Sequence, residues 1–121
     1  RGLGDVYKRQ LDYLSNGIEL AKANGINDII IDPGFGFAKN TKQNFTLLNN
    51  LEDFKVLNYP ILVGISRKSM IYKTLNIDVQ KALNGTTVLH TVALLKGANI
   101  IRTHDVKELK ECIKLIDELD C

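Results

Sequence analysis

Short apolar runs alternate along the chain with longer stretches in which apolar residues recur every three or four positions. The short runs predict strands over residues 28–31, 61–65 and 99–102, and each of them ends at polar or charged residues. A short apolar run bounded in this way is typical of a buried strand, whereas the longer periodic stretches are typical of amphipathic helices. The pattern therefore predicts three strand–helix units in succession.

A further helix precedes the first strand, with Leu11, Leu14, Ile18 and Ala21 on one face and Gly25 at its end. Thr41 is the predicted N-cap of the helix after the first strand. The second strand is followed by a short helical turn over 70–75 and by a helix from 79 to 96 that Asp78 caps. Asp105 begins the last helix with a capping-box pattern.

Gly85 lies inside the predicted helix over 79–96, where it costs about 1 kcal/mol relative to alanine. It marks either a close contact between helices or a break in the helix.

The spacing of the strand ends indicates the fold class. Asp32, Gly64 and Arg102 are separated by 32 and 38 residues. An eight-stranded (β/α) barrel of ~250 residues has about 30 residues per unit. We therefore expect an α/β fold in which three parallel strands alternate with helices, as part of a TIM barrel, with the sheet covered on both faces. A small open three-layer sandwich is the alternative.

Composition narrows the function classes. The chain has 121 residues, enough for one domain, and a net charge of +2 that is too small and too dispersed to favour nucleic acid. No apolar run reaches the about 18 residues that span a bilayer. Cys112 and Cys121 belong to no CxxC pair, which favours a buried residue and a terminal thiol in a reducing, cytoplasmic setting.

Residues 1–10 show no clear period, and we interpret them as an unassigned edge of foreign or truncated origin, with the domain covering 11–121.

The first strand end offers an acceptor group. Asp32 presents two acceptor oxygens, which suit a heterocycle with adjacent N–H donors, although capping of a loop is an equally good interpretation. The Gly-Phe-Gly-Phe segment at 34–37 permits tight turns and carries no phosphate-loop pattern.

The other two strand ends offer cations. Ser66, Arg67, Lys68 and Ser69 form the densest polar cluster, which suits an anion or an electron-rich ring atom; a solvent-facing basic loop is the alternative. Arg102 and His104 lie two residues apart on the third strand and so share a face, where they could clamp a phosphate beside the next helix. His90 lies in mid-helix, and we interpret it as a packing or surface residue.

Together, these segments resemble the dihydropteroate synthase family, whose pattern is D-P-G-x-G-F, then L-V-G-x-S-R-K-S, then I-x-R-x-H-D-V. The three motifs stand here at residues 32–37, 62–69 and 100–106. The resemblance runs from Leu11 to the C-terminus and implies a C-terminal fragment, the last three βα units of a TIM barrel. Ala38, Tyr72 and Thr103 differ from the residues that are common in the family at these positions, which are Gly, Gly and Val.

The resemblance implies an enzyme of folate biosynthesis that condenses 4-aminobenzoate with dihydropterin-CH2-diphosphate to dihydropteroate and releases pyrophosphate. By resemblance, three groups of residues bind the substrates: Asp32, Gly64 and Lys68 the pterin, Arg102, Thr103 and His104 the diphosphate, and Phe37, Ser66 and Arg67 the aminobenzoate. Such chemistry needs mainly positioning and stabilisation of charge.

The resemblance also implies magnesium, held by an Asn outside this segment, and a homodimer at full length, with no role for nucleic acid or membrane. Three parallel strands leave two open edges, so we expect an incomplete fragment that is inactive alone. The alternatives are a pterin-binding methyltransferase domain, which would lack the Ser-Arg-Lys-Ser cluster, a non-catalytic barrel remnant, and a generic phosphate-binding α/β enzyme.

Overall fold

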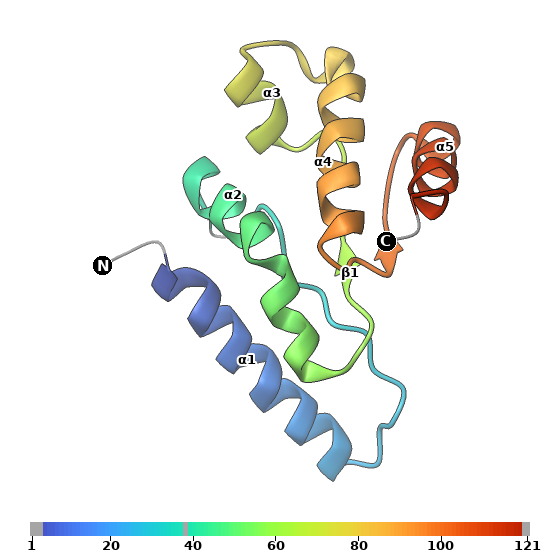
Figure 1. Cartoon of the computed structure of the whole chain (residues 1–121). Helices are drawn as coiled ribbons and strands as arrows, with labels where there is room; N and C mark the ends of the chain where they lie inside the picture. Colours follow the sequence, from blue (N-terminus) through green and yellow to red (C-terminus); the bar gives the residue numbers. More distant parts are fainter. Residues whose placement is uncertain (1–3, 38, 120–121) are drawn as a thin grey trace.

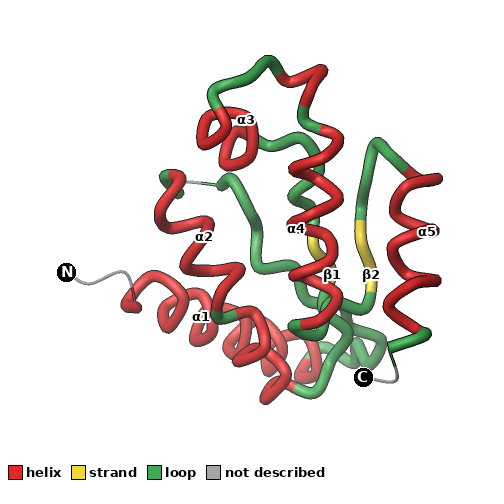
Figure 2. Tube along the Cα trace, turned by 45° about the horizontal axis from the view of Figure 1, so that its top comes forward, coloured by secondary structure: helices red, strands yellow, loops and turns green. Residues whose placement is uncertain are grey.

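Five α-helices and two short strands make up most of the described chain (Figures 1 and 2). The computed structural model describes residues 4–37 and 39–119. In chain order the elements are α1 (Gly4–Ala23), α2 (Thr41–Asn49), the 3-10 helix η1 (Leu51–Leu57), β1 (Leu62–Val63), α3 (Ser69–Leu75), the 3-10 helix η2 (Val79–Lys81), α4 (Leu83–Leu95), β2 (Ile100–Ile101) and α5 (Val106–Asp117).

The strand segments run parallel, as the sequence predicts. β1 and β2 pair with Leu62 opposite Ile100 and Val63 opposite Ile101. Ile31 adds one parallel bridge to Ile61, on the other side of β1. The order and direction of the three predicted strands are therefore confirmed.

The strands are shorter than their predicted ranges. The strand expected over 28–31 is reduced to the bridge at Ile31, and those expected over 61–65 and 99–102 retain two residues each. Among the described residues, the two outer segments pair on one side only. They lack the second row of hydrogen bonds that would extend a ladder.

The described helices cover one face of this sheet. Val63 is fully buried and Ile101 packs on the core, whereas Leu62 is half-buried and Ile100 is 38% exposed. Successive residues of a strand point to opposite faces, and register partners share a face. The expectation that both faces are covered is thus wrong for this segment. One covered face fits the outer wall of a barrel better than a three-layer sandwich.

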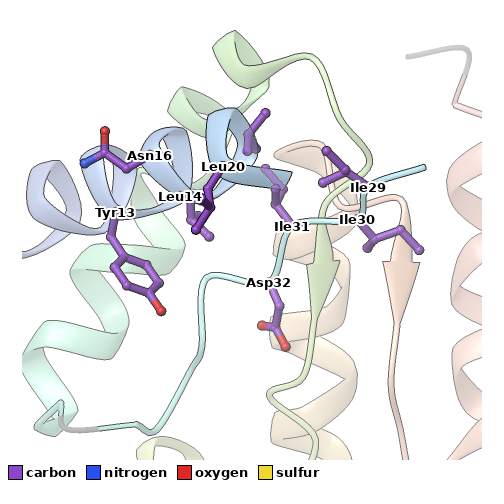
Figure 3. Close-up of a pocket in the computed structure, with 10 residues that line it drawn as sticks. Tyr13, Leu14, Asn16, Leu20, Ile29, Ile30, Ile31 and Asp32 are labelled. Atoms are coloured by element: carbon purple, nitrogen blue, oxygen red, sulfur yellow. The ribbon is translucent and has the colours of Figure 1, made fainter. Parts of the chain in front are cut away.

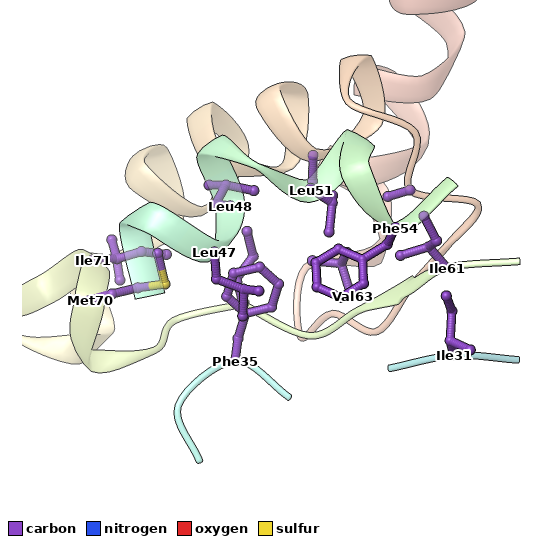
Figure 4. Packing of buried hydrophobic residues seen from close by; sticks show 14 residues of the cluster. Ile31, Phe35, Leu47, Leu48, Leu51, Phe54, Ile61, Val63, Met70 and Ile71 are labelled. Carbon is purple, nitrogen blue, oxygen red and sulfur yellow. The ribbon is translucent and has the colours of Figure 1, made fainter. Parts of the chain in front are cut away.

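The core lies between the covered face of the strands and the helices α2, η1, α3 and α4 (Figure 4). Its fully buried large apolar side chains are Phe35, Leu47, Leu51, Phe54, Ile61, Val63, Ile65 and Met70. Phe35 belongs to the loop after Ile31, so this core also anchors the first polar segment.

Helix α1 starts earlier than the sequence predicts. It begins at Gly4, and its predicted apolar face packs Leu11, Leu14 and Ile18 against the core. The helix continues without a break through residue 10. The domain boundary at residue 11 and the origin of residues 1–10 stay predictions, and residues 1–3 lie outside the described range.

Two helix starts differ from their predicted caps. The N-cap of α2 is Asn40, one residue before the predicted Thr41, and its side chain and that of Gln43 each accept the other's backbone N–H at 2.8 Å. Asp105 is the N-cap of α5, but its side chain makes no capping bond and binds Arg67 instead. The guanidinium offers two parallel N–H donors to the two carboxylate oxygens, and this bidentate pairing explains the exchange.

The helix predicted over 79–96 is divided into η2 and α4, and Gly85 lies inside α4. A Cβ at Gly85 would lie 2.5 Å from Cγ2 of Ile71 and 3.1 Å from Cδ1 of Leu75, both on α3. Of the two interpretations of this glycine, the close helix contact is the one that the structure supports.

We expect Gly85→Ala to lower the free energy of unfolding by about 1–3 kcal/mol, because buried Ile71 would have to move to admit the methyl group. Helix propensity alone would favour alanine by about 1 kcal/mol. Gly17→Ala in α1 is the matched control, since a Cβ there meets nothing within 4 Å and should stabilise the chain. Urea denaturation measures both; a Gly85→Ala chain as stable as the control would contradict the steric explanation.

Two residues predicted to serve packing are buried. His90 on α4 is 2% exposed, and burial lowers the pKa of its imidazole against a weaker opposing attraction from Asp105. Cys112 on α5 is 8% exposed, with its Sγ 3.1 Å from Oγ1 of Thr91. Of the two interpretations of His90, packing is the one that the structure supports, and the predicted burial of Cys112 is confirmed, while Cys121 lies outside the described residues.

Candidate active site

The loops that follow the three parallel segments meet at one end of the sheet, as their sequence pattern predicts. Nη1 of Arg102 lies 3.8 Å from Oδ2 of Asp32, and the two side chains are 59% and 40% exposed. Gly64 leaves room for this approach, because a Cβ there would lie 2.8 Å from Cζ of Arg102. The Gly34 N–H donates to Asp32 Oδ1 at 2.9 Å. Asp32 and Arg102 therefore face each other across Gly64 and remain accessible to a ligand.

Lys68 connects the first loop to the second. Its Nζ donates to the carbonyl oxygen of Phe35 at 2.7 Å and lies 5.5 Å from the centroid of the Phe37 ring. A Cβ at Gly36 would lie 3.4 Å from the same nitrogen, so the lysine lies directly on this backbone. An ammonium group has three N–H donors. One bond to a carbonyl leaves it capacity to bind a ligand.

Ser66 connects the second loop to the third. Its Oγ lies 2.8 Å from Nδ1 of His104, accepts the His104 backbone N–H at 3.1 Å and lies 3.4 Å from Oγ1 of Thr103. Because this oxygen already accepts from the backbone, its own proton can be donated to Nδ1. That assignment places the ring proton on Nε2 of an exposed imidazole, where it can donate to an anion.

Arg67 is directed to Asp105. Its Nε and Nη2 donate to the two carboxylate oxygens at 3.0 and 2.8 Å, and its Nη1 donates to the backbone carbonyls of Val79 and Gln80. Hydrogen bonding within the pair raises the pKa of Arg67 and lowers the pKa of Asp105. Sequence reasoning interpreted Asp105 only as a cap and missed this partnership.

A buried amide holds the glycine-rich loop. Oδ1 of Asn44 accepts the Gly36 N–H at 2.9 Å, and Asn44 is 4% exposed on α2. Sequence reasoning did not identify this residue as part of the site. The signal was present, since Asn44 shares a helical face with Leu47, Leu48 and Leu51, and a polar residue on an apolar face needs a partner.

Lys39 holds the same loop from its other end. Its Nζ donates to the carbonyls of Gly34 at 2.8 Å and Phe37 at 3.1 Å. Burial lowers the pKa of Lys39, against an opposing attraction from Asp32. Ala38, a departure from the family pattern, lies outside the described residues.

An apolar hollow adjoins the site at Asp32 (Figure 3). Its walls are side chains of α1, among them Tyr13 and Leu20, and the segment Ile29–Ile31. A second hollow is bordered by Arg67, Lys68 and Asp78. Asp32 and Lys68 thus each lie at the margin of an open space.

Neither a metal cluster nor a membrane span occurs in the described residues. Within 4–37 and 39–119, no three His, Cys, Asp or Glu side chains gather where they could hold a metal ion. No helix in the same residues is long and apolar enough to cross a membrane. The residues present do not fit a magnesium site, so we derive no metal-dependent step from them.

Comparison with known proteins gives one consistent family. A family model described as "Pterin binding enzyme" matches residues 3–104. Dihydropteroate synthase of Escherichia coli (strain K12) is 40% identical over 115 residues, which are 93% of this chain and 41% of that protein. The Clostridium beijerinckii synthase is 44% identical over 110 residues, or 88% and 41%. The chain thus spans about two fifths of the length of these curated relatives.

Solved structures agree with this result. The dihydropteroate synthase of Yersinia pestis superposes with a TM-score of 0.92 at 36% identity, over 95% of this chain and 48% of that one. The Coxiella burnetii synthase in complex with pteroic acid gives 0.92 at 41% identity, over 95% and 43%. The Thermus thermophilus synthase in complex with 4-aminobenzoate gives 0.92 at 31% identity, over 97% and 48%.

These matches settle the fold class. The helices and the small parallel sheet superpose on part of a TIM-barrel enzyme, which explains why one face of the sheet is covered and its edges are open. Because the family model covers more than half of the sequence, the chain belongs to the family of pterin-binding enzymes.

Proposed function

We propose that this chain forms part of a dihydropteroate synthase, which joins 4-aminobenzoate to dihydropterin-CH2-diphosphate and releases pyrophosphate. The observation that carries the proposal is the arrangement of Asp32, Lys68, Arg102 and His104 at one end of the parallel strands. This arrangement occurs in a chain whose relatives are dihydropteroate synthases.

Asp32, Gly64 and Lys68 form the pterin side of the proposed site. Oδ1 of Asp32 accepts the Gly34 N–H, while Oδ2 lies 3.8 Å from the Arg102 guanidinium and keeps capacity to accept from adjacent N–H donors of a ring. Lys68 offers N–H donors to the polar edge of the same ring. Gly64 contributes by its missing side chain, since a larger residue would displace the Arg102 guanidinium.

Arg102, Thr103 and His104 form the diphosphate side. In the reaction, the amine nitrogen forms a bond to the methylene carbon, while the bond from that carbon to the diphosphate oxygen breaks. The bonding electrons leave with the pyrophosphate, and the new secondary amine loses a proton. An exposed guanidinium and an imidazole N–H that face the departing oxygens would stabilise the developing charge.

Phe37 and Ser66 form the aminobenzoate side. The Phe37 ring is 71% exposed and can pack on a benzene ring, and Ser66 frames the loop that leads to His104. Sequence analysis also placed Arg67 on this side. In the structure its guanidinium is occupied by Asp105.

The remaining features of the proposal concern the whole enzyme. We propose magnesium as its metal, with a ligand outside this segment, a homodimer as its assembly and the cytoplasm as its compartment. Relatives solved with pteroic acid and with 4-aminobenzoate support small molecules as substrates.

A chimeric barrel tests the function. The matched segment of the Escherichia coli synthase, 40% identical, is replaced by this chain, and release of pyrophosphate is followed with 4-aminobenzoate and dihydropterin-CH2-diphosphate. We expect the chimera to turn over within about tenfold of the parent and the isolated chain to show no turnover, because three strands do not close a barrel.

Titration of the same chimera with pteroic acid separates the alternatives. Binding without turnover would contradict the synthase and favour a binding module, and a folded chimera that binds no pteroic acid would favour a barrel remnant. Circular dichroism of the chimera shows whether it has folded.

A further inference from the structure

We propose that Arg67 is a positioning residue that contacts neither substrate, an inference that rests on the proposed function. Its ion pair with Asp105 joins the loop after β1 to the loop after β2 and so holds Ser66 against His104. The arguments are the occupancy of its donors, the conformation of its backbone and the bonds that continue from Asp105.

The guanidinium of Arg67 has little capacity left for a ligand. It has five N–H donors, and four acceptor atoms surround it: two carboxylate oxygens of Asp105 and the carbonyl oxygens of Val79 and Gln80. A substrate carboxylate that is bound in bidentate fashion needs two N–H groups on one edge. The edge that suits this geometry is already used by Asp105.

The backbone fixes the direction of this side chain. Arg67 has a φ of 53°, in the left-handed region that residues other than glycine rarely adopt. Its N–H donates to Oγ1 of Thr86 at 3.0 Å, and Thr86 is 1% exposed on α4. Such strain persists only where the surroundings determine it. Here this backbone conformation directs the Arg67 side chain toward Asp105. Ser66 and Lys68 are its two neighbours in the same loop.

Bonds that begin at Asp105 lead to the reactive end of the site. The Asp105 N–H donates to Oγ1 of Thr103 at 2.9 Å, and the Thr103 hydroxyl lies 3.4 Å from Oγ of Ser66. Ser66 in turn bonds to both the ring and the backbone of His104. A displacement of Asp105 is therefore transmitted to the imidazole through these hydrogen bonds.

The pair also removes a charge conflict. The carboxylate of Asp105 lies next in sequence to His104, on the side assigned to the diphosphate, and an unpaired carboxylate there would repel that anion. Pairing with Arg67 neutralises this carboxylate, so that the charge of Arg102 and the ring N–H of His104 face the diphosphate side without an opposing charge.

The test follows the His104 imidazole by long-range 1H–15N NMR in the 121-residue chain. Arg67→Gln and Asp105→Asn should shift its ring nitrogens in the same direction, and the double variant should add nothing to the larger single shift. A purely electrostatic influence would shift them in opposite directions, since the two variants remove opposite charges. Lys96→Gln is the control, because it breaks the 3.4 Å ion pair with Glu52, and it should leave His104 unchanged.

Arg67→Lys keeps the charge and one carboxylate bond, so it should give an intermediate shift and serves if the Gln variant does not fold. Unmoved His104 resonances in the Arg67 variants, or shifts of opposite sign, would overturn the proposal.

Kinetics of the chimeric barrel provide the second arm. Arg67→Lys and Asp105→Asn should each lower kcat by about 10- to 100-fold with the KM for 4-aminobenzoate within about threefold of wild type. A rise confined to that KM in the Arg67 variant alone would show substrate contact and overturn the positioning role. An inactive wild-type chimera would count against the proposed function, and the NMR comparison would still decide the part of Arg67.

Discussion

Replacing Lys68 with methionine in the chimeric barrel is expected to lower kcat/KM by about 10²–10³-fold and to weaken binding of pteroic acid. Methionine keeps much of the length of the side chain and removes its charge and N–H donors. A preorganised donor aimed at the reacting molecule contributes an effect of this size. Steady-state kinetics and a pteroic acid titration of the folded variant measure it.

The structure explains why the loss should be so large. Nζ of Lys68 is held by the Phe35 carbonyl at 2.7 Å and lies on the backbone of Gly36, so little reorganisation is needed when a ligand arrives. Lys73→Met is the matched control, because Lys73 is exposed on α3, and it should leave both quantities within about twofold. Pteroic acid affinity that is the same in both variants would contradict the role assigned to Lys68.

The sequence predicts which segments meet, because parallel strands separated by helices bring their carboxyl ends to one edge. Asp32 and Arg102 are 70 positions apart and lie 3.8 Å from each other, as the strand pattern requires. Burial of Cys112 follows in the same way from its helical position, and burial of His90 agrees with one of its two interpretations. Local sequence patterns therefore predict which strand ends meet and which face of a helix is buried.

The pattern fails where a long-range bond replaces a local one. Asp105 followed by Glu108 is a sound capping signal, yet the carboxylate binds Arg67, 38 positions earlier. A local sequence pattern contains no information about a guanidinium that another loop places beside the carboxylate. The predicted length of the first strand is wrong for a related reason. The number of ladder bonds at Ile31 depends on neighbouring strands on both sides, and not only on the apolar sequence of the segment itself.

Replacing Phe35 with alanine is expected to lower the free energy of unfolding of the chain by about 3–5 kcal/mol, the range for loss of a buried aromatic ring. Phe35 is 1% exposed and packs into the core formed by α2 and the strands (Figure 4). Urea denaturation followed by circular dichroism measures the change. If the alanine variant is unfolded without denaturant, Phe35→Leu gives a smaller loss that can still be measured.

Phe37→Ala is the matched control, two residues along the same loop and 71% exposed, and it should change stability by less than about 0.5 kcal/mol. The comparison also separates the two parts of this loop. The Phe35 ring anchors the loop backbone in the core, and the Phe35 carbonyl in that backbone accepts a hydrogen bond from Lys68. Phe35→Leu should therefore also weaken pteroic acid binding in the chimera. Equal stability losses at Phe35 and Phe37 would contradict this anchoring, because only one of the two rings is buried.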